Sequence, residues 1–105
     1  MSGMDVLCVG QLCVDLLVRP VERLDYGVDT VRVDGIDLRS GGDSLNVALG
    51  LRKLGVSVGF CGKVGTDMLG DYLAGVIAES GIDGRGLKRC GEAGTCACLV
   101  LINGK

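Results

Sequence analysis

The order of apolar segments and helix patterns is the feature that most constrains the fold of this chain. Residues 6–9 are a continuous apolar run that Gly10 ends, and residues 56–61 form a second run. Such runs are typical of strands covered on both faces of a parallel sheet. One helix pattern precedes the second run and another follows it. This order of strand, helix, strand and helix predicts an α/β fold with parallel pairing and crossover connections.

Both helices carry start and stop signals. Asp43 or Ser44 is a suitable N-cap for the first helix and Gly55 a suitable stop, with a predicted apolar face of Val47, Ala48, Leu51 and Leu54. Asp67 is expected to cap the second helix and Gly81 to end it. The predicted buried face of that helix comprises Leu69, Leu73, Val76 and Ile77.

Three further segments have an extended pattern. Residues 12–18 precede Arg19-Pro20, residues 30–38 alternate apolar and polar side chains with a slip that a bulge at Gly35 would explain, and residues 95–102 resemble a strand. Alternation indicates strands with one wet or ligand-facing side, so we expect a separate small antiparallel layer. Asn103-Gly104 is a strong hairpin signal with a single residue after it. We therefore expect the chain to be the front part of a larger protein.

Composition excludes several function classes. The 105 residues contain no His, six Cys without a Cys-x-x-Cys pair, and a formal net charge of -2. Histidine-based catalysis, the usual zinc sites and binding of nucleic acid are therefore not expected. The apolar N-terminus carries Asp5 and Asp15 and no early basic residue, which argues against a signal peptide or membrane span. We expect a cytoplasmic protein that does not bind membranes.

In the cytoplasm the cysteines should be free thiols. Their neighbours predict that four of them are buried as small hydrophobic residues, namely Cys8, Cys61, Cys96 and Cys98. Cys13 and Cys90 lie near predicted strand ends and are expected to be more exposed.

Phosphate-binding loops of known pattern are not found. No Gly-x-Gly-x-x-Gly segment occurs, and Gly62-Lys63 is followed by Val64 where a P-loop requires Ser or Thr. The strongest local constellation is Gly41-Gly42 before a helix that carries Asn46 in its first turn. Two glycines let a ligand approach the backbone, helix-start N–H groups donate, and an amide both donates and accepts. This suits a ligand with many hydroxyls, whereas the alternative interpretation is a plain tight turn.

The wider spacing resembles a known family. Gly41-Gly42, Asn46-Val47-Ala48, Gly55 and Gly65 match the first signature of the ribokinase-like family of sugar and nucleoside kinases, also called the PfkB carbohydrate kinase family. Residues 62–71 and the opening from Val9 to Asp15 are also similar to that family. Ser44 departs from the Gly, Ala or Pro that is usual at its position.

The resemblance implies a parallel α/β core with a small β lid and a sugar between them. Residues 4–10 and 42–83 would form the core, and residues 12–40 and 86–105 the lid. Asp15 would hold sugar hydroxyls, Gly41 and Gly42 would lie against the sugar, and Asn46 would contact it. Cys13 stands where a ribose-specific member has Asn, which disfavours ribose. Cys98 would face the substrate from the lid, although its alternation with Cys96 equally suits a buried face.

The resemblance also implies transfer of the γ-phosphoryl group of ATP, with Mg²⁺, to a sugar hydroxyl. The family's second signature, Gly-Ala-Gly-Asp, supplies the catalytic base and does not occur in this chain. We therefore expect the intact protein to be the enzyme, and these 105 residues alone to be inactive and to bind neither ATP nor metal. A homodimer formed through the lid is also expected. The alternatives are a nucleoside kinase of the same family, a non-catalytic sugar-binding or assembly module, and a generic nucleotide-binding α/β domain.

Overall fold

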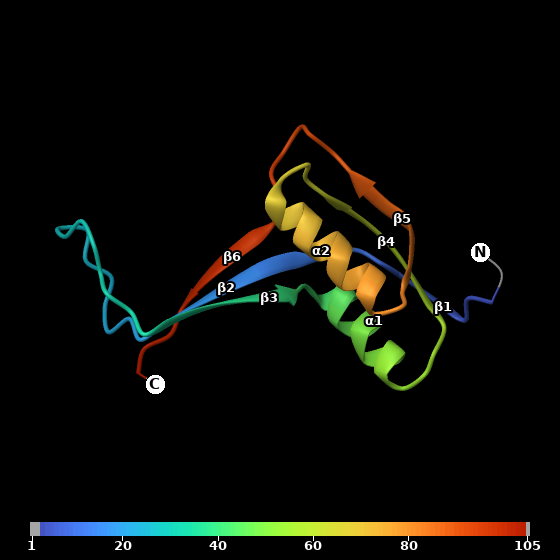
Figure 1. Ribbon diagram of the computed structural model, residues 1–105, viewed down its shortest axis with the longest axis horizontal. Coiled ribbons are helices and arrows are strands. Elements are labelled where there is room, and N and C mark those ends of the chain that lie inside the picture. The colour runs from blue at the N-terminus through green and yellow to red at the C-terminus, as the bar shows by residue number, and fades with distance from the viewer. Residues whose placement is uncertain (1–2, 105) are drawn as a thin grey trace.

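A parallel three-stranded sheet forms the core of the molecule. The computed structural model describes residues 3–104. Strands β1 (Val6–Val9), β4 (Val58–Val64) and β5 (Asp83–Arg89) lie in the order β1-β4-β5, and both pairs are parallel. Helices α1 (Asp43–Lys53) and α2 (Met68–Glu79) pack on this sheet (Figure 1). The expected α/β arrangement is confirmed.

One apolar cluster joins the sheet to both helices. Its fully buried side chains are Phe60 of β4, Leu45 of α1, Leu73 and Ile77 of α2, and Val14, which enters from outside the core sheet. Burial of each such side chain contributes roughly 1.5 to 3 kcal/mol. On β1, Cys8 faces this cluster whereas Leu7 and Val9 lie on the exposed face. The helices therefore cover a single face of the core sheet.

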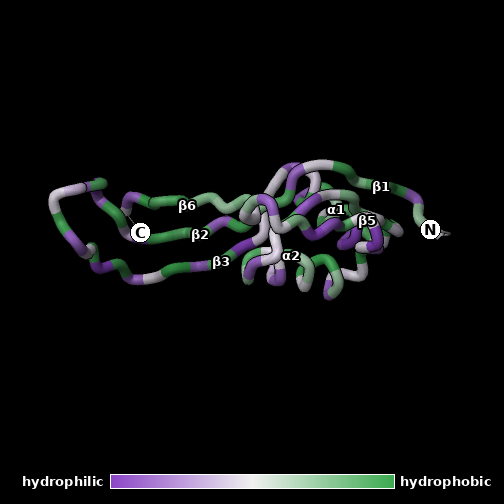
Figure 2. The backbone as a smooth tube through the Cα atoms, turned by 90° about the horizontal axis from the view of Figure 1, so that it is seen from above, coloured by the Kyte–Doolittle hydropathy of each residue, from purple (hydrophilic) through white to green (hydrophobic). Residues whose placement is uncertain are grey.

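A second sheet projects from the core as a long ribbon, which we call the lid (Figures 1 and 2). It comprises β2 (Cys13–Arg19), β3 (Gly35–Gly41) and β6 (Ala97–Leu101) in the order β3-β2-β6. The β2–β3 pair is antiparallel, but β2 and β6 are parallel because both strands run outward from the core. The lid is therefore mixed and not purely antiparallel as expected.

The boundary between lid and core also differs from the expectation. Residues 86–89 were expected in the lid, but they belong to β5 and pair with residues 61–64 of β4. Gly86 makes this pairing possible, because a Cβ there would lie 2.8 Å from the Phe60 carbonyl oxygen. In addition, residues 30–34 form no strand, and β3 begins at Gly35 without a bulge. The register irregularity lies instead between Gly59 and Cys61 of β4.

The helix ends follow the sequence signals more closely than the helix faces do. Asp67 caps α2 as expected and accepts a hydrogen bond from Gly70 N at 2.8 Å. The N-cap of α1 is Gly42, however, and it has no capping side chain. Ala48 is buried as expected, but Val47 and Leu54, which were expected to face the core, are exposed, and Leu45 is buried although it was not placed on the predicted face. None of the described helices is both long and apolar enough to cross a membrane.

Candidate functional site

One face of the lid gathers the predicted site residues of β2 and its neighbours. In the strand register, Cys13 pairs with Gly41 of β3, and Asp15 pairs with Arg39 of β3 and Cys98 of β6. Paired residues project from the same side of a sheet, and so do residues two apart along one strand. Cys13, Asp15, Gly41 and Cys98 therefore share one face.

The Asp15 carboxylate lies directly against the backbone of Gly41. A Cβ on Gly41 would overlap Asp15 Oδ2 and would lie 3.3 Å from Cys13 Sγ. The Cys13 thiol donates to Asp15 Oδ1 across 3.7 Å. Only glycine leaves room for this arrangement, so the carboxylate is held where β3 ends and α1 begins.

Gly42 is required for a different reason. Its φ is 97°, and a Cβ there would lie 2.7 Å from the Gln11 carbonyl oxygen and 2.8 Å from Leu12 Cα. Both the conformation and the space therefore favour glycine. The close approach brings the unpaired N–H groups at the start of α1 beside the inner end of the lid, near Asp15.

Asn46 lies in the first turn of α1, and its backbone N–H donates to the Gly42 carbonyl oxygen at 2.9 Å. The residue is exposed, so its side chain is open to a ligand at the helix start. The structure thus brings Cys13, Asp15 and Gly41 into contact and places Asn46 one helical turn beyond Gly42.

The exposure of the cysteines differs from the sequence expectation. Cys13 was expected to be exposed and is 7% exposed, whereas Cys96 and Cys98 were expected to be buried and are exposed. The reason is topological, because β6 is an edge strand of the projecting lid. Burial and then the charge of Asp15 raise the pKa of Cys13 to about 11. Cys13 is therefore a protonated donor to Asp15 and not a nucleophile.

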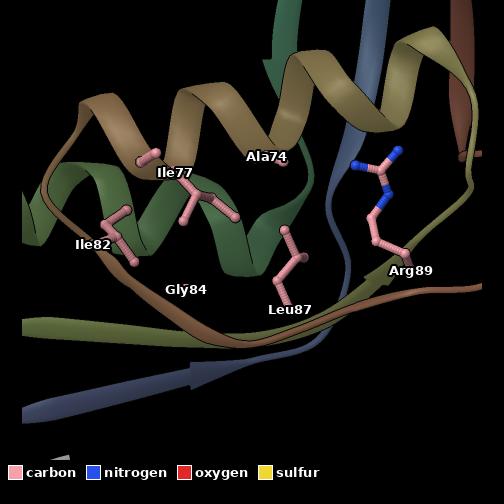
Figure 3. Close-up of a pocket in the computed structure, with 7 residues that line it drawn as sticks. Ala74, Ile77, Ile82, Gly84, Leu87 and Arg89 are labelled. Carbon is pink, nitrogen blue, oxygen red and sulfur yellow. The ribbon is translucent and has the colours of Figure 1, made fainter.

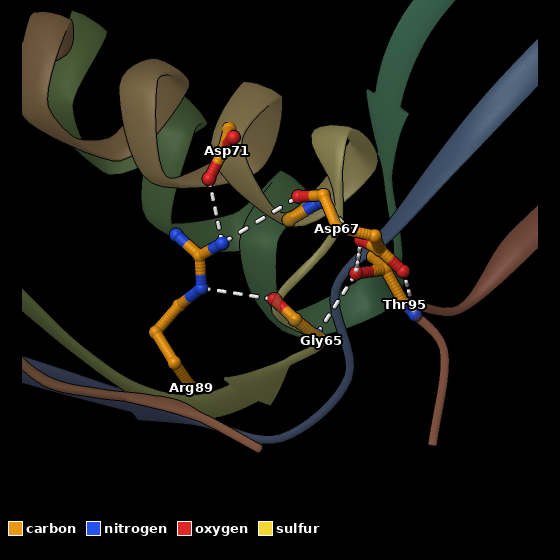
Figure 4. Close-up of polar contacts among 6 residues, drawn as sticks. Gly65, Asp67, Asp71, Arg89 and Thr95 are labelled. Carbon is orange, nitrogen blue, oxygen red and sulfur yellow. Dashed lines mark hydrogen bonds and ion pairs between the residues drawn. The ribbon is translucent and has the colours of Figure 1, made fainter. Parts of the chain in front are cut away.

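A polar network that ties the lid to the core was not foreseen from the sequence (Figure 4). Asp67 accepts from the Thr95 hydroxyl at 2.5 Å and from Thr95 N at 3.0 Å, while Gly65 N donates to the Thr95 hydroxyl at 2.9 Å. Arg89 donates to the Gly65 carbonyl oxygen at 2.9 Å and to Asp71 at 2.6 Å. Because Thr95 lies two residues before the start of β6, the network fixes where that strand leaves the core.

Cavities of about 360, 270 and 260 Å³ are lined by residues other than those of the predicted site. One, of about 360 Å³, lies between α2 and β5 and is mostly apolar, with Ile77, Ile82 and Leu87 turned toward it (Figure 3). Another, of about 260 Å³, touches Asp43 and Ser44 at the start of α1. Neither includes Asp15, Gly41 or Asn46. Residues 3–104 also contain no cluster of three or more His, Cys, Asp or Glu side chains that could hold a metal ion.

A parallel α/β core with a small mixed sheet projecting from it is the arrangement of the ribokinase-like fold, of which this chain holds part. Residues 4–105 match the model of the pfkB family carbohydrate kinases. The chain belongs to this family.

Sequence relatives include two sugar kinases. The chain is 32% identical over 79 residues to a 5-dehydro-2-deoxygluconokinase of Shouchella clausii, covering 75% of this chain and 23% of the relative. It is 31% identical over 99 residues to a probable fructokinase of Arabidopsis thaliana, covering 94% of this chain and 27% of that protein. The chain therefore spans about a quarter of the length of these relatives.

Solved structures of sugar kinases are also similar to this chain. A fructokinase from Xylella fastidiosa superimposes with a TM-score of 0.75 at 31% identity, covering 90% of this chain and 27% of that one. An uncharacterized sugar kinase from Pyrococcus horikoshii also gives 0.75, at 30% identity, covering 94% of this chain and 32% of that one. Both of those proteins have been solved with ATP bound.

The Asp67 network predicts a pH-dependent contribution to stability. Hydrogen bonds from the Thr95 side chain, then from the backbone N–H groups of Thr95 and Gly70, lower the pKa of Asp67 from 3.8 to about 2. A carboxyl whose pKa is lowered by folding stabilises the fold above its unfolded pKa, and this contribution is lost as the pH falls through the folded pKa. Asp67→Asn keeps a capping side chain but removes the charge. We expect it to destabilise the chain near neutral pH, with the deficit shrinking as the pH falls from about 4 to about 2.

Urea denaturation of wild type and variant across this pH range measures the deficit. Asp5→Asn, which removes an exposed carboxylate elsewhere, is the matched control and should show little deficit at any pH. Asp83, whose pKa is also lowered to about 2 by Arg85, is present in all three proteins and cancels in the comparison. A deficit for Asp67→Asn that is the same at pH 2 and at neutral pH would contradict the assignment.

Proposed function

We propose that this chain is the N-terminal, sugar-binding part of an ATP-dependent carbohydrate kinase that phosphorylates a sugar hydroxyl. The observation that carries the proposal is the Asp15 carboxylate held against Gly41, beside the helix start that Gly42 creates. Membership of the family and the likeness to sugar kinases solved with ATP support the same function.

The geometry suits recognition of a polyhydroxylated ligand. An ionised carboxylate accepts from two neighbouring hydroxyls, and each such bond contributes roughly 1.5 to 3 kcal/mol. Cys13 donates to one carboxylate oxygen, which fixes the orientation of the group. The backbone at Gly41 and Gly42 leaves space for a sugar ring, and Asn46 offers an amide donor and acceptor. Holding the acceptor hydroxyl in place is a large part of what phosphoryl transfer requires.

The residues of this chain do not themselves fit ATP with Mg²⁺. The described residues offer no metal-binding cluster, and the sequence has neither a phosphate loop nor a Gly-Ala-Gly-Asp segment. When bound, ATP supplies the phosphoryl group and Mg²⁺ neutralises charge on the phosphates. We place their site and the catalytic base in a later part of a longer protein.

A nucleoside kinase is the second candidate. It is favoured by the likeness to the aminoimidazole riboside kinase of Salmonella enterica, with a TM-score of 0.71 at 25% identity over 90% of this chain. That structure holds aminoimidazole riboside and an ATP analogue. The alternative that is not an enzyme is a non-catalytic sugar-binding module. An assay of phosphate transfer from ATP by the longer protein distinguishes the three candidates. A sugar kinase phosphorylates sugars, a nucleoside kinase phosphorylates nucleosides, and a non-catalytic module phosphorylates neither.

The lid also presents an apolar face, opposite the one with Asp15. It is formed by alternate residues of the three lid strands, namely Leu16, Val18, Ile36, Leu38, Leu99 and Leu101. Four of these are exposed, with Leu99 at 63% and Ile36 at 62%. A contiguous apolar face next to a free strand edge favours burial against another surface. We propose that a second copy of the lid covers it in a homodimer.

The 105-residue chain is expected to phosphorylate no sugar by itself, because the ATP site and catalytic base are assigned to another part of the protein. Release of ADP, measured in a coupled assay with a panel of sugars, tests this. Turnover above background that disappears in the Asp15→Ala chain would show that the chain alone is an enzyme.

In the longer protein, Asp15→Ala should reduce kcat/KM for the sugar by about 2 to 5 kcal/mol, through loss of charge-assisted hydrogen bonds. These bonds form in the ground state and in the transition state, so KM should rise more than kcat falls. Asn46→Ala should cost only about 0.5 to 1.5 kcal/mol, because its hydrogen bonds are neutral.

Steady-state kinetics with the sugar varied measures both effects. Asp29→Ala, which removes an exposed carboxylate outside the strands, is the control and should leave both parameters unchanged. If Asp15 is only a solvated carboxylate on a strand, its variant will match the control, and the proposed sugar site is wrong.

The dimer is tested by placing a charge on the apolar face. Leu99→Asp should convert a dimeric longer protein to monomer, because an unpaired carboxylate cannot be buried without a large penalty. Leu54→Asp changes the C-cap leucine that follows α1, which is 80% exposed, and should leave the dimer intact. Light scattering coupled to gel filtration gives the mass of each. A wild-type mass of one subunit at micromolar concentration would rule out the dimer.

A further inference from the structure

Two cysteines lie side by side where the lid leaves the core. In the parallel β2–β6 register, Val14 pairs with Ala97. The Val14 N–H donates to the Cys96 carbonyl oxygen at 3.0 Å, so the pairing extends back to Cys96 and Cys13. Adjacent strands are about 4.8 Å apart, and a disulfide spans Cα separations of roughly 4.4 to 6.8 Å. The backbone therefore already holds these two residues at a distance that suits a disulfide.

Both thiols belong to the face of the lid that carries Asp15. Cys13 is two residues before Asp15 on β2, and residues two apart share a face. Cys96 is two residues before Cys98, which pairs with Asp15. The Cys96 sulfur accepts from the Gln11 side-chain amide at 3.6 Å. Burial and then the charge of Asp15 raise the pKa of Cys13, and the neighbouring Cys96 thiol adds to this rise.

The thiols of this face differ in access and in reach. Cys13 is 7% exposed, whereas Cys96 and Cys98 are exposed, so an oxidant in solution reaches β6 first. Cys98 lies two residues further along its strand than Cys96. Its Cα is therefore about 8 Å from that of Cys13, which is too far for a disulfide. On this face of the lid, Cys96 is the residue placed to pair with Cys13.

We propose that Cys13 and Cys96 are a site of reversible oxidation whose disulfide weakens the proposed sugar site. The oxidant is a soluble disulfide such as glutathione disulfide. The Cys96 thiolate attacks one of its sulfur atoms, forms a mixed disulfide and releases one glutathione. Cys13 then attacks the Cys96 sulfur and displaces the second glutathione. Two protein thiols are oxidised to one disulfide, glutathione disulfide is reduced to two thiols, and these take up the two protons that the cysteines lose.

The second step is open to Cys13 although its thiol is protonated at neutral pH. Its attack on Cys96 is intramolecular, and two groups held in place react as if at very high concentration, which offsets a small fraction of thiolate. The Cys13 S–H already donates to Asp15 Oδ1, which can accept the proton as the new bond forms.

Oxidation removes the thiol that orients the Asp15 carboxylate. In the disulfide the Cys13 sulfur has no hydrogen, so Asp15 Oδ1 loses its donor. We expect weaker binding of the sugar hydroxyls as a result. This consequence rests on the proposed sugar-binding function, whereas formation of the disulfide does not.

The disulfide is tested in the longer protein and in its Cys96→Ser and Cys98→Ser variants. Each is incubated in glutathione buffers of increasing oxidised fraction, and disulfides are mapped by mass spectrometry of proteolytic peptides. We expect a bond between Cys13 and Cys96 in wild type and in Cys98→Ser, and its reversal by dithiothreitol. Cys98→Ser is the matched control, because it removes an exposed thiol of the same face that cannot reach Cys13.

Sugar kinetics of each protein, oxidised and then reduced again, measure the consequence. Oxidation should lower kcat/KM for the sugar about 3- to 10-fold in wild type and Cys98→Ser, mainly through KM, as expected for loss of one hydrogen bond. Cys96→Ser should change by less than about twofold between its own two forms.

The possible failures are distinguishable. Absence of the Cys13–Cys96 bond, or a glutathione adduct on Cys96 alone, would overturn the inference and leave the kinase function standing. A disulfide that leaves kcat/KM unchanged would overturn its effect on the sugar site. A protein that forms the disulfide but phosphorylates no sugar would overturn the proposed function and leave the oxidation site standing.

Discussion

The close contact between the end of β3 and the inner part of β2 determines how the rest of the molecule is arranged. Gly42 packs on the backbone of Gln11 and Leu12, and Gly41 packs on the carboxylate of Asp15. A Cβ at Gly42 would force the two segments apart, and a Cβ at Gly41 would displace the Asp15 carboxylate. Because α1 begins directly after this contact, the same two glycines set the position of the lid, the start of the helix and the orientation of the carboxylate.

Most of the core could be predicted from the sequence because its signals are local. The apolar run of β1, the Asp67 cap of α2 and the stop signals at Gly55 and Gly81 depend on neighbouring residues only. Residues 86–89 of β5 were assigned to the wrong sheet because Lys88 and Arg89 hide the apolar pattern of an edge strand, and their pairing depends on Gly86, which lets the strand approach β4. Such long-range packing leaves little trace in the sequence of the strand itself.

The candidate site was also predictable only in part, because some of its features depend on contacts between segments that are distant in the sequence. Gly41 and Asn46 follow from a spaced motif and Asp15 from the likeness of the opening segment to the family, and the structure places Asp15 against Gly41. The buried state of Cys13 and the exposure of Cys98 depend on which lid strand lies at the edge, which residue alternation does not specify. Thr95 was missed because its partners, Gly65 and Asp67, lie about 30 residues earlier.

All three lid strands are attached to the core at the same end. Leu12 and Val14 anchor β2 in the apolar cluster, Gly41 and Gly42 join β3 to α1, and Thr95 ties the start of β6 to Asp67. The lid is therefore attached to the core at one end only, and its displacement under thermal motion grows with distance from that end. Asp15 and Arg39 lie near the attached end and should be displaced little, whereas the outer residues, such as Arg19 and Ile36, should show the largest displacement. The residues of the proposed sugar site thus lie in the part of the lid that is held most firmly.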